Sequence, residues 1–108
     1  MATKWYEYAE KKLKKKEKFE RNFEGRLDGN YGHLFITNMR LLFIKQEGFL
    51  RKSYEMILDL PQKNVESLEC TGKYQMDIVE SGGNRHRFES DIVASRIEKI
   101  IKEVFMAD

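Results

Sequence analysis

The chain has little cysteine, little proline and no long hydrophobic run. A single cysteine, Cys70, excludes an internal disulfide and a metal site built from several cysteines. The single proline, Pro61, predicts the end of a strand. The longest apolar run, Leu41–Ile44, has four residues, against the roughly 20 that span a bilayer. Because no apolar signal segment follows the start, we expect a cytoplasmic protein.

Composition is that of one globular domain with an uneven charge distribution. Hydrophobic residues make up 41% of the 108 residues, and the net charge is +2. Residues 1–18 carry seven lysines against three glutamates, whereas residues 19–91 carry ten basic against twelve acidic residues. A nucleic-acid binder usually presents a basic face on its folded body. The acidic body therefore argues against nucleic-acid binding.

Residues 4–17 are predicted to form a basic amphipathic helix. They lack glycine and proline, and Trp5, Tyr8 or Ala9, and Leu13 recur at spacings of three and four. Two interpretations follow: the helix lies in a membrane interface, or it docks on the body of the protein with its lysines in water. The candidate residues of an interfacial helix are Trp5, Tyr8, Lys11, Lys12 and Lys15.

From Phe19 onward the hydrophobic period changes to two, which predicts strands. The expected strands are 19–27, 33–37, 40–45, 54–60, 65–70, 74–78 and 85–90. Strand 40–45 is apolar on both faces and is expected to be central. After Asp91 the period returns to that of a helix, with Ser90 or Asp91 as its N-cap. Such a twisted antiparallel meander is expected to curl into a barrel, which the last helix caps.

One segment resembles a known family. Gly32 to Phe43, with Thr37-Asn38-Met39-Arg40 at its centre, is similar to the strand–turn–strand signature of GRAM and bacterial PH-like domains. The resemblance implies a PH-like barrel over residues 19–108, preceded by the basic segment 1–18. Asn38 suits a tight turn, and Arg40 is placed to tie down carbonyls or a carboxylate. These residues therefore indicate a fold and not an activity.

The resemblance implies lipid-headgroup or protein binding at loops of the barrel. The loop at residues 47–52 places two large apolar residues beside two cations. In the PH-like layout this loop shares an end with loops 28–32 and 81–84, so basic residues are expected to converge there. The candidate ligand- or membrane-binding residues are Arg26, Phe49, Leu50, Arg51, Lys52 and Arg85. The alternative is that Phe49 folds back onto the barrel or onto a second subunit.

The residues predict no catalytic, metal or cofactor site. His33 and His86 lie in expected strands, and Cys70 is expected in the core. The first strand and loop offer only Arg26 beside Asp28, which argues against a phosphoinositide clamp. We expect a non-enzymatic binding or scaffolding module that recognises a protein partner or its own copies. The alternative is peripheral binding to anionic membranes through loop 47–52 and the lysine-rich helix.

Overall fold

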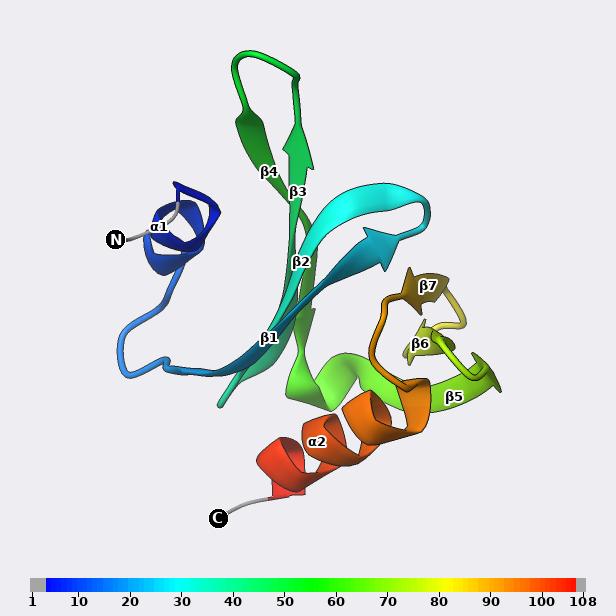
Figure 1. The fold of residues 1–108 in the computed structure, drawn as a ribbon. Helices are drawn as coiled ribbons and strands as arrows, with labels where there is room; N and C mark the ends of the chain where they lie inside the picture. Colours follow the sequence, from blue (N-terminus) through cyan, green and yellow to red (C-terminus); the bar gives the residue numbers. More distant parts are fainter. Residues whose placement is uncertain (1–3, 107–108) are drawn as a thin grey trace.

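The computed structural model describes residues 4–106 and is mainly β, as predicted (Figure 1). One antiparallel sheet of seven strands has the order β4-β3-β2-β1-β7-β6-β5. The strands are β1 (Phe19–Leu27), β2 (Asn30–Thr37), β3 (Arg40–Glu47), β4 (Ser53–Pro61), β5 (Val65–Gly72), β6 (Gln75–Glu80) and β7 (Arg85–Glu89). The helices are α1 (Lys4–Glu10), the 3-10 turn η1 (Gln62–Asn64) and α2 (Ala94–Met106). The first three residues of the predicted basic segment lie outside the described residues.

The sheet curls but does not close into a barrel, so the predicted barrel is wrong in this respect. Strands β4 and β5 stand at opposite ends of the strand order, and no pairing joins them within residues 4–106. Pro61 has no N–H to continue a ladder, and η1 turns the chain away before β5 begins. A hydrogen bond from Gln62 Nε2 to the Phe105 carbonyl instead ties this corner to α2.

The main core lies between the curled sheet and α2. Alternate residues of the strands, such as Leu34, Ile36 and Phe43, point toward α2 and are fully buried. Ile97 and Ile101, one turn apart on α2, complete this core. The predicted helical stripe and the predicted strand alternation are therefore confirmed.

A second, smaller core lies between α1 and the opposite face of β2–β4. Ala9 of α1 and Phe35, Leu42 and Ile44 of the sheet are all fully buried there. Strand β3 is thus covered on both faces, which explains why its sequence is continuously apolar. It is an interior strand, between β4 and β2, although the middle of the strand order is β1 and not β3 as predicted. The α1 helix stands apart from α2 across the sheet (Figure 1).

Three local predictions are wrong. The first helix ends at Glu10 and not at residue 17, because hydrogen bonds from Arg40 and to Asn38 hold the following segment against the β2–β3 turn. Ser90 Oγ accepts a hydrogen bond from the Ile92 N–H at 3.1 Å, but α2 begins only at Ala94, so neither Ser90 nor Asp91 starts the helix. Cys70 is exposed near the end of the edge strand β5, where its Sγ donates a hydrogen bond to Glu98 Oε1 of α2 at 3.1 Å.

Candidate functional site

The end of β3 and the turn that follows it, residues 47–52, project beyond the body of the protein and are named the β3–β4 tip (Figure 1). Phe49 is 92% exposed and Leu50 is 91% exposed. Gly48 adopts a φ of 103°, and a Cβ there would lie 1.9 Å from the Arg51 carbonyl oxygen. The tight turn holds both apolar side chains in solvent, so Phe49 does not fold back onto the sheet.

Cations gather beside the tip. A hollow of about 580 Å³ is lined by Lys4 of α1 together with Leu50, Arg51, Lys52 and Tyr54. Within residues 4–106, none of these three cations forms an ion pair. The neighbouring carboxylate of Glu47 is paired with Lys45 at 3.1 Å. The tip thus combines two exposed apolar side chains with three neighbouring cations, one of which, Lys4, comes from a distant part of the sequence.

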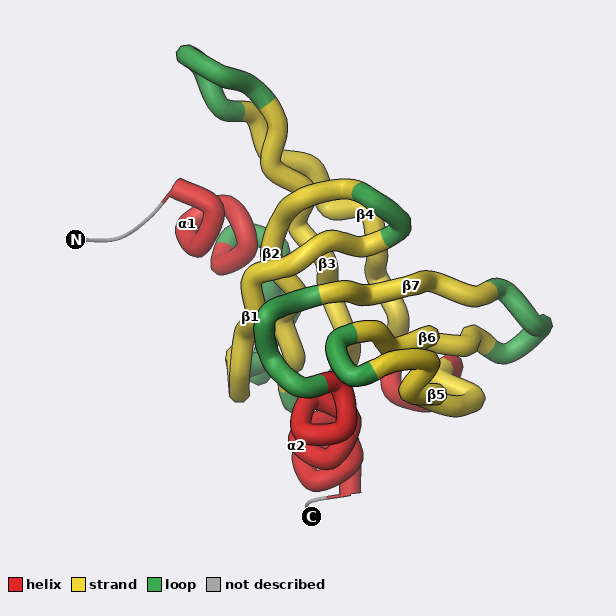
Figure 2. The backbone as a smooth tube through the Cα atoms, turned by 45° about the vertical axis from the view of Figure 1, so that its right-hand side comes forward, coloured by secondary structure: helices red, strands yellow, loops and turns green. Residues whose placement is uncertain are grey.

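The other predicted basic residues do not join the tip. Arg85 forms ion pairs with Glu69 at 3.0 Å and with Asp77 at 3.2 Å. Arg26 lines a separate hollow beside β7. The β3–β4 tip also points away from the β1–β2 and β6–β7 turns in both views (Figure 2). The predicted convergence of Arg26 and Arg85 with residues 47–52 is therefore wrong, because the long β3–β4 hairpin extends past the other turns.

Aromatic side chains dock α1 onto the sheet. The Trp5 ring stacks on His33, with centroids 3.7 Å apart and planes inclined by 10°. The Tyr8 ring lies 6.0 Å from that of Tyr54. The apolar face of the helix is thus occupied, as in the second interpretation of the sequence. The predicted lysines Lys11, Lys12 and Lys15 remain exposed, and Lys12 Nζ lies 5.0 Å from the centre of the Tyr8 ring.

The two histidines have different environments, and both are engaged structurally. His33 is buried under Trp5, and burial lowers its pKa. Its Nδ1 has no hydrogen-bond partner among residues 4–106. Burial also opposes charge on His86, but contacts with Glu80 and Asp28 outweigh it and raise the pKa.

No cluster of three or more metal-ligating side chains occurs in the described part of the chain. No helix among these residues is long and apolar enough to cross a membrane.

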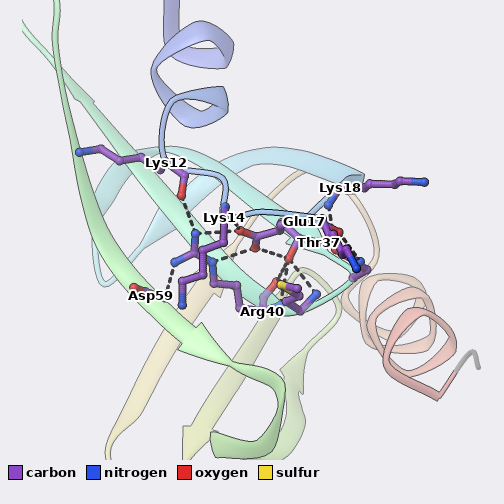
Figure 3. A network of polar contacts seen from close by, with 10 residues as sticks. Lys12, Lys14, Glu17, Lys18, Thr37, Arg40 and Asp59 are labelled. Atoms are coloured by element: carbon purple, nitrogen blue, oxygen red, sulfur yellow. Dashed lines mark hydrogen bonds and ion pairs between the residues drawn. The ribbon is translucent and has the colours of Figure 1, made fainter.

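A buried polar cluster, the Arg40 cluster, lies where the segment after α1 meets the β2–β3 turn (Figure 3). Arg40, 3% exposed, forms two charged contacts with Glu17, through Nε at 2.8 Å and Nη2 at 2.9 Å. Its remaining donors reach Asp59 at 2.8 Å and the Lys12 carbonyl at 2.7 Å. The predicted role of Arg40 in tying down carbonyls and a carboxylate is confirmed.

The β2–β3 turn completes the cluster. Thr37 donates its hydroxyl proton to Glu17 at 2.7 Å and accepts the Arg40 N–H at 2.9 Å. Asn38 Oδ1 accepts the Lys18 N–H at 2.8 Å, and Lys16 adopts a φ of 67°. Residues 11–18 are therefore fixed to the turn and cannot continue the helix. This attachment is what positions α1, and with it Lys4, beside the tip.

The Glu17 carboxyl is the most strongly perturbed acid in the cluster. Burial alone would raise its pKa, but hydrogen bonds from Arg40, the Lys14 N–H and Thr37, with the Arg40 charge, lower it from 4.5 to about 2. Because the folded-state pKa lies below the unfolded value, Glu17 stabilises the fold above about pH 4.5. This stabilisation is lost as the pH falls toward about 2.

We expect Glu17→Gln to flatten the dependence of stability on acid. From the lowered pKa, at about 1.4 kcal/mol per pKa unit, the unfolding free energy of the unmodified protein should lose about 3 kcal/mol more than that of the variant between about pH 5 and pH 2. Urea unfolding followed by circular dichroism at both pH values measures this. Parallel losses in the two proteins would contradict the assigned role of Glu17.

Sequence reasoning found the tip but missed Glu17 and Lys4. Glu17 is the single acidic residue among the lysines of residues 11–18. This isolated position was the one sequence feature that could have indicated its role. Nothing in the sequence placed Lys4 near residue 50, because their proximity depends on the docking of α1. The chain matches no protein-family model, and no curated protein shows significant similarity to it.

Proposed function

We propose that the chain is a PH-like binding module without catalytic activity, and that its β3–β4 tip attaches it to anionic membrane surfaces. The PH-like assignment is supported by two antiparallel meanders, β1–β4 and β5–β7, joined where β1 pairs with β7, by a C-terminal helix against the sheet, and by the Thr37–Arg40 turn. A non-catalytic role is supported by His33 lying under Trp5 and by His86 being held between two carboxylates.

The observation that carries the membrane proposal is the exposure of Phe49 and Leu50 at a projecting turn beside three cations. Burying a large apolar side chain contributes about 1.5–3 kcal/mol. Each cation near an acidic bilayer contributes about 1 kcal/mol. The two effects act together in an interface where apolar residues enter the acyl region and cations meet headgroups.

The small size of the tip favours a bilayer over a protein partner. A stable protein interface covers about 800 Å² on each side, which two apolar side chains on a narrow turn do not supply. A bilayer needs no complementary surface and accepts such a tip directly. The exposed lysines of residues 11–18 add long-range attraction to an acidic surface, which salt screens.

The membrane proposal predicts pelleting with vesicles that depends on both acidic lipid and the tip. At low salt, the protein should pellet with vesicles of phosphatidylcholine containing phosphatidylserine, and remain in solution with phosphatidylcholine alone. Phe49→Ser with Leu50→Ser should weaken binding by more than tenfold, because each loss removes about 1.5–3 kcal/mol. Arg51→Glu should weaken binding by about tenfold or more, because it reverses one charge at the surface.

The matched control is Met106→Ser, which removes an 80% exposed apolar side chain from the far end of α2. It should bind as the unmodified protein does. Equal pelleting of the tip variants would rule out the tip as the membrane contact.

Recognition of a protein partner or of a second copy is the other proposed function, and unpaired strand edges favour it. β4 and β5 each have one edge without a partner strand in the described part of the chain. Sedimentation velocity without lipid separates this from membrane binding. A concentration-dependent dimer that is lost in the Phe49→Ser, Leu50→Ser variant would assign the tip to self-association instead.

A further inference from the structure

Strand β1 has a free edge along most of its length. It pairs with β2 from Phe19 to Leu27, but with β7 only at Arg26 and Leu27. A Cβ at Gly25 would lie 2.3 Å from the Glu89 carbonyl oxygen, so β7 crosses β1 closely at this point. Before Gly25, the β7 side of β1 has no partner strand within residues 4–106.

A groove runs beside this edge. It has a volume of about 600 Å³, and five consecutive residues of β1, 22–26, form one of its walls. Glu89, the last residue of β7, and residues 90–92 of the connection to α2 form the other wall. The connection and the free half of β1 lie next to each other (Figure 2). A further strand would lie about 4.8 Å from β1, which is inside this groove.

The backbone of β1 presents hydrogen-bonding groups to the groove. The Asp28 N–H donates to the Arg87 carbonyl on the β7 side at 2.8 Å. Because the peptide groups of a strand alternate in direction, those of Asn22 and Glu24 point to the same side. Neither residue pairs with β7. An added strand would therefore exchange N–H and C=O bonds with both residues.

The side chains around the groove select the charge of the occupant. Three lining residues are acidic, namely Glu24, Glu89 and Asp91, and one is basic, Arg26. Phe23 is half-buried, and Ile92 is 37% exposed, which supplies an apolar floor. Net negative charge together with apolar contact favours a segment in which Lys or Arg alternates with apolar residues.

We propose that this groove binds an extended, Lys/Arg-rich peptide segment of a partner protein as an additional strand on β1. Main-chain bonds to Asn22 and Glu24 provide the affinity, and the surrounding carboxylates select basic side chains. This proposal rests on the protein-binding function and is independent of the β3–β4 tip. It gives that function a defined surface and a defined partner chemistry.

The test begins with selection of a random heptapeptide phage library on the intact protein. The enriched peptides should carry Lys or Arg at alternate positions. Titration of a synthetic selected peptide into ¹⁵N-labelled protein should shift the amide signals of residues 22–26 most strongly. The same peptide methylated on alternate backbone nitrogens keeps its charge but cannot pair, and it should bind at least about tenfold more weakly.

Variants provide the second arm of the test. Asp91→Lys should lower the affinity for the peptide by about tenfold. Glu103→Lys, an acid-to-base change on the outer face of α2, should leave this affinity unchanged. Enrichment of acidic or sequence-unrelated peptides, or equal binding of the methylated peptide, would overturn the proposal. Amide shifts confined to the edge of β4 or β5 would show that the peptide does not bind in the groove, although the protein-binding function would stand. None of these outcomes depends on membrane attachment. The vesicle experiment tests the membrane proposal separately, so that proposal can fail while the peptide proposal stands.

Discussion

Replacing Arg40 by alanine is expected to lower the free energy of unfolding by about 3–5 kcal/mol, the cost of leaving a buried charge without its partner. The Arg40 side chain is 3% exposed and that of Glu17 is fully buried. Removing the guanidinium leaves Glu17 facing only Thr37 and the Lys14 N–H. It also removes a donor from the Lys12 carbonyl, so residues 11–18 lose their main attachment to the sheet.

The measurement is urea unfolding near neutral pH, with Arg85→Ala as the matched control. Arg85 also forms two ion pairs, but its side chain is 52% exposed, and its buried partner Asp77 keeps a second ion pair with Arg87. Ion pairs of an exposed side chain contribute little to stability. Arg40→Ala should therefore be much the more destabilising of the two. Equal, small losses would mean that the Arg40 cluster does not hold α1 and the sheet together.

Gly32→Ala is the second substitution with a large expected effect. A Cβ at Gly32 would lie 2.0 Å from the Ile44 carbonyl oxygen and 2.9 Å from the Phe43 ring. Gly32 pairs with Lys45 in the β2–β3 ladder, so neither strand can move without breaking the register of the central hairpin. We expect a loss of about 3 kcal/mol or more, at or above the upper end of the usual cost of overpacking.

The control for this substitution is Gly72→Ala. Gly72 is also in a strand, but a Cβ there would meet its nearest neighbour, Gln75, at an ordinary 3.7 Å. The free energy of unfolding of the Gly72→Ala variant should differ from that of the unmodified protein by less than about 0.5 kcal/mol, as for most surface substitutions. Thermal unfolding of both variants distinguishes the close approach at Gly32 from a general cost of alanine in strands. Similar melting temperatures for the two would contradict the tight packing of β2 on β3.

Several parts of the candidate sites were readable from residue order. The apolar pair Phe49–Leu50 follows Gly48 and precedes two cations, which predicted a loop of mixed apolar and basic character. That Phe49 is exposed and does not fold back onto the sheet was decided only by the structure. The Thr37–Arg40 turn was also predicted to be structural, and Arg40 was predicted to hold carbonyls or a carboxylate. The groove beside β1 was not predicted. Its existence depends on where β7 leaves β1, and no pattern within either strand records that point.

The sequence by itself determined the secondary-structure class of most segments and which side of each is buried. Alternation every two residues marks a strand with one covered face, and the stripe from Ile97 to Phe105 marks a helix with one covered face. These signals are local, since they compare each residue with neighbours only a few positions away. The continuous apolar run of β3 likewise predicted that both faces of this strand are buried.

Only the tertiary structure decided where the first helix ends, whether the sheet closes and which cations meet. Residues 4–17 have good helix propensity, but Arg40 takes the Lys12 carbonyl and Asn38 binds residues 16 and 18. Contacts between residues 20 to 28 positions apart therefore override the local helix propensity after Glu10. Lys4 reaches the tip, and the sheet remains open, for the same reason: such arrangements depend on competition among distant contacts, which the hydrophobic pattern of a single segment does not encode.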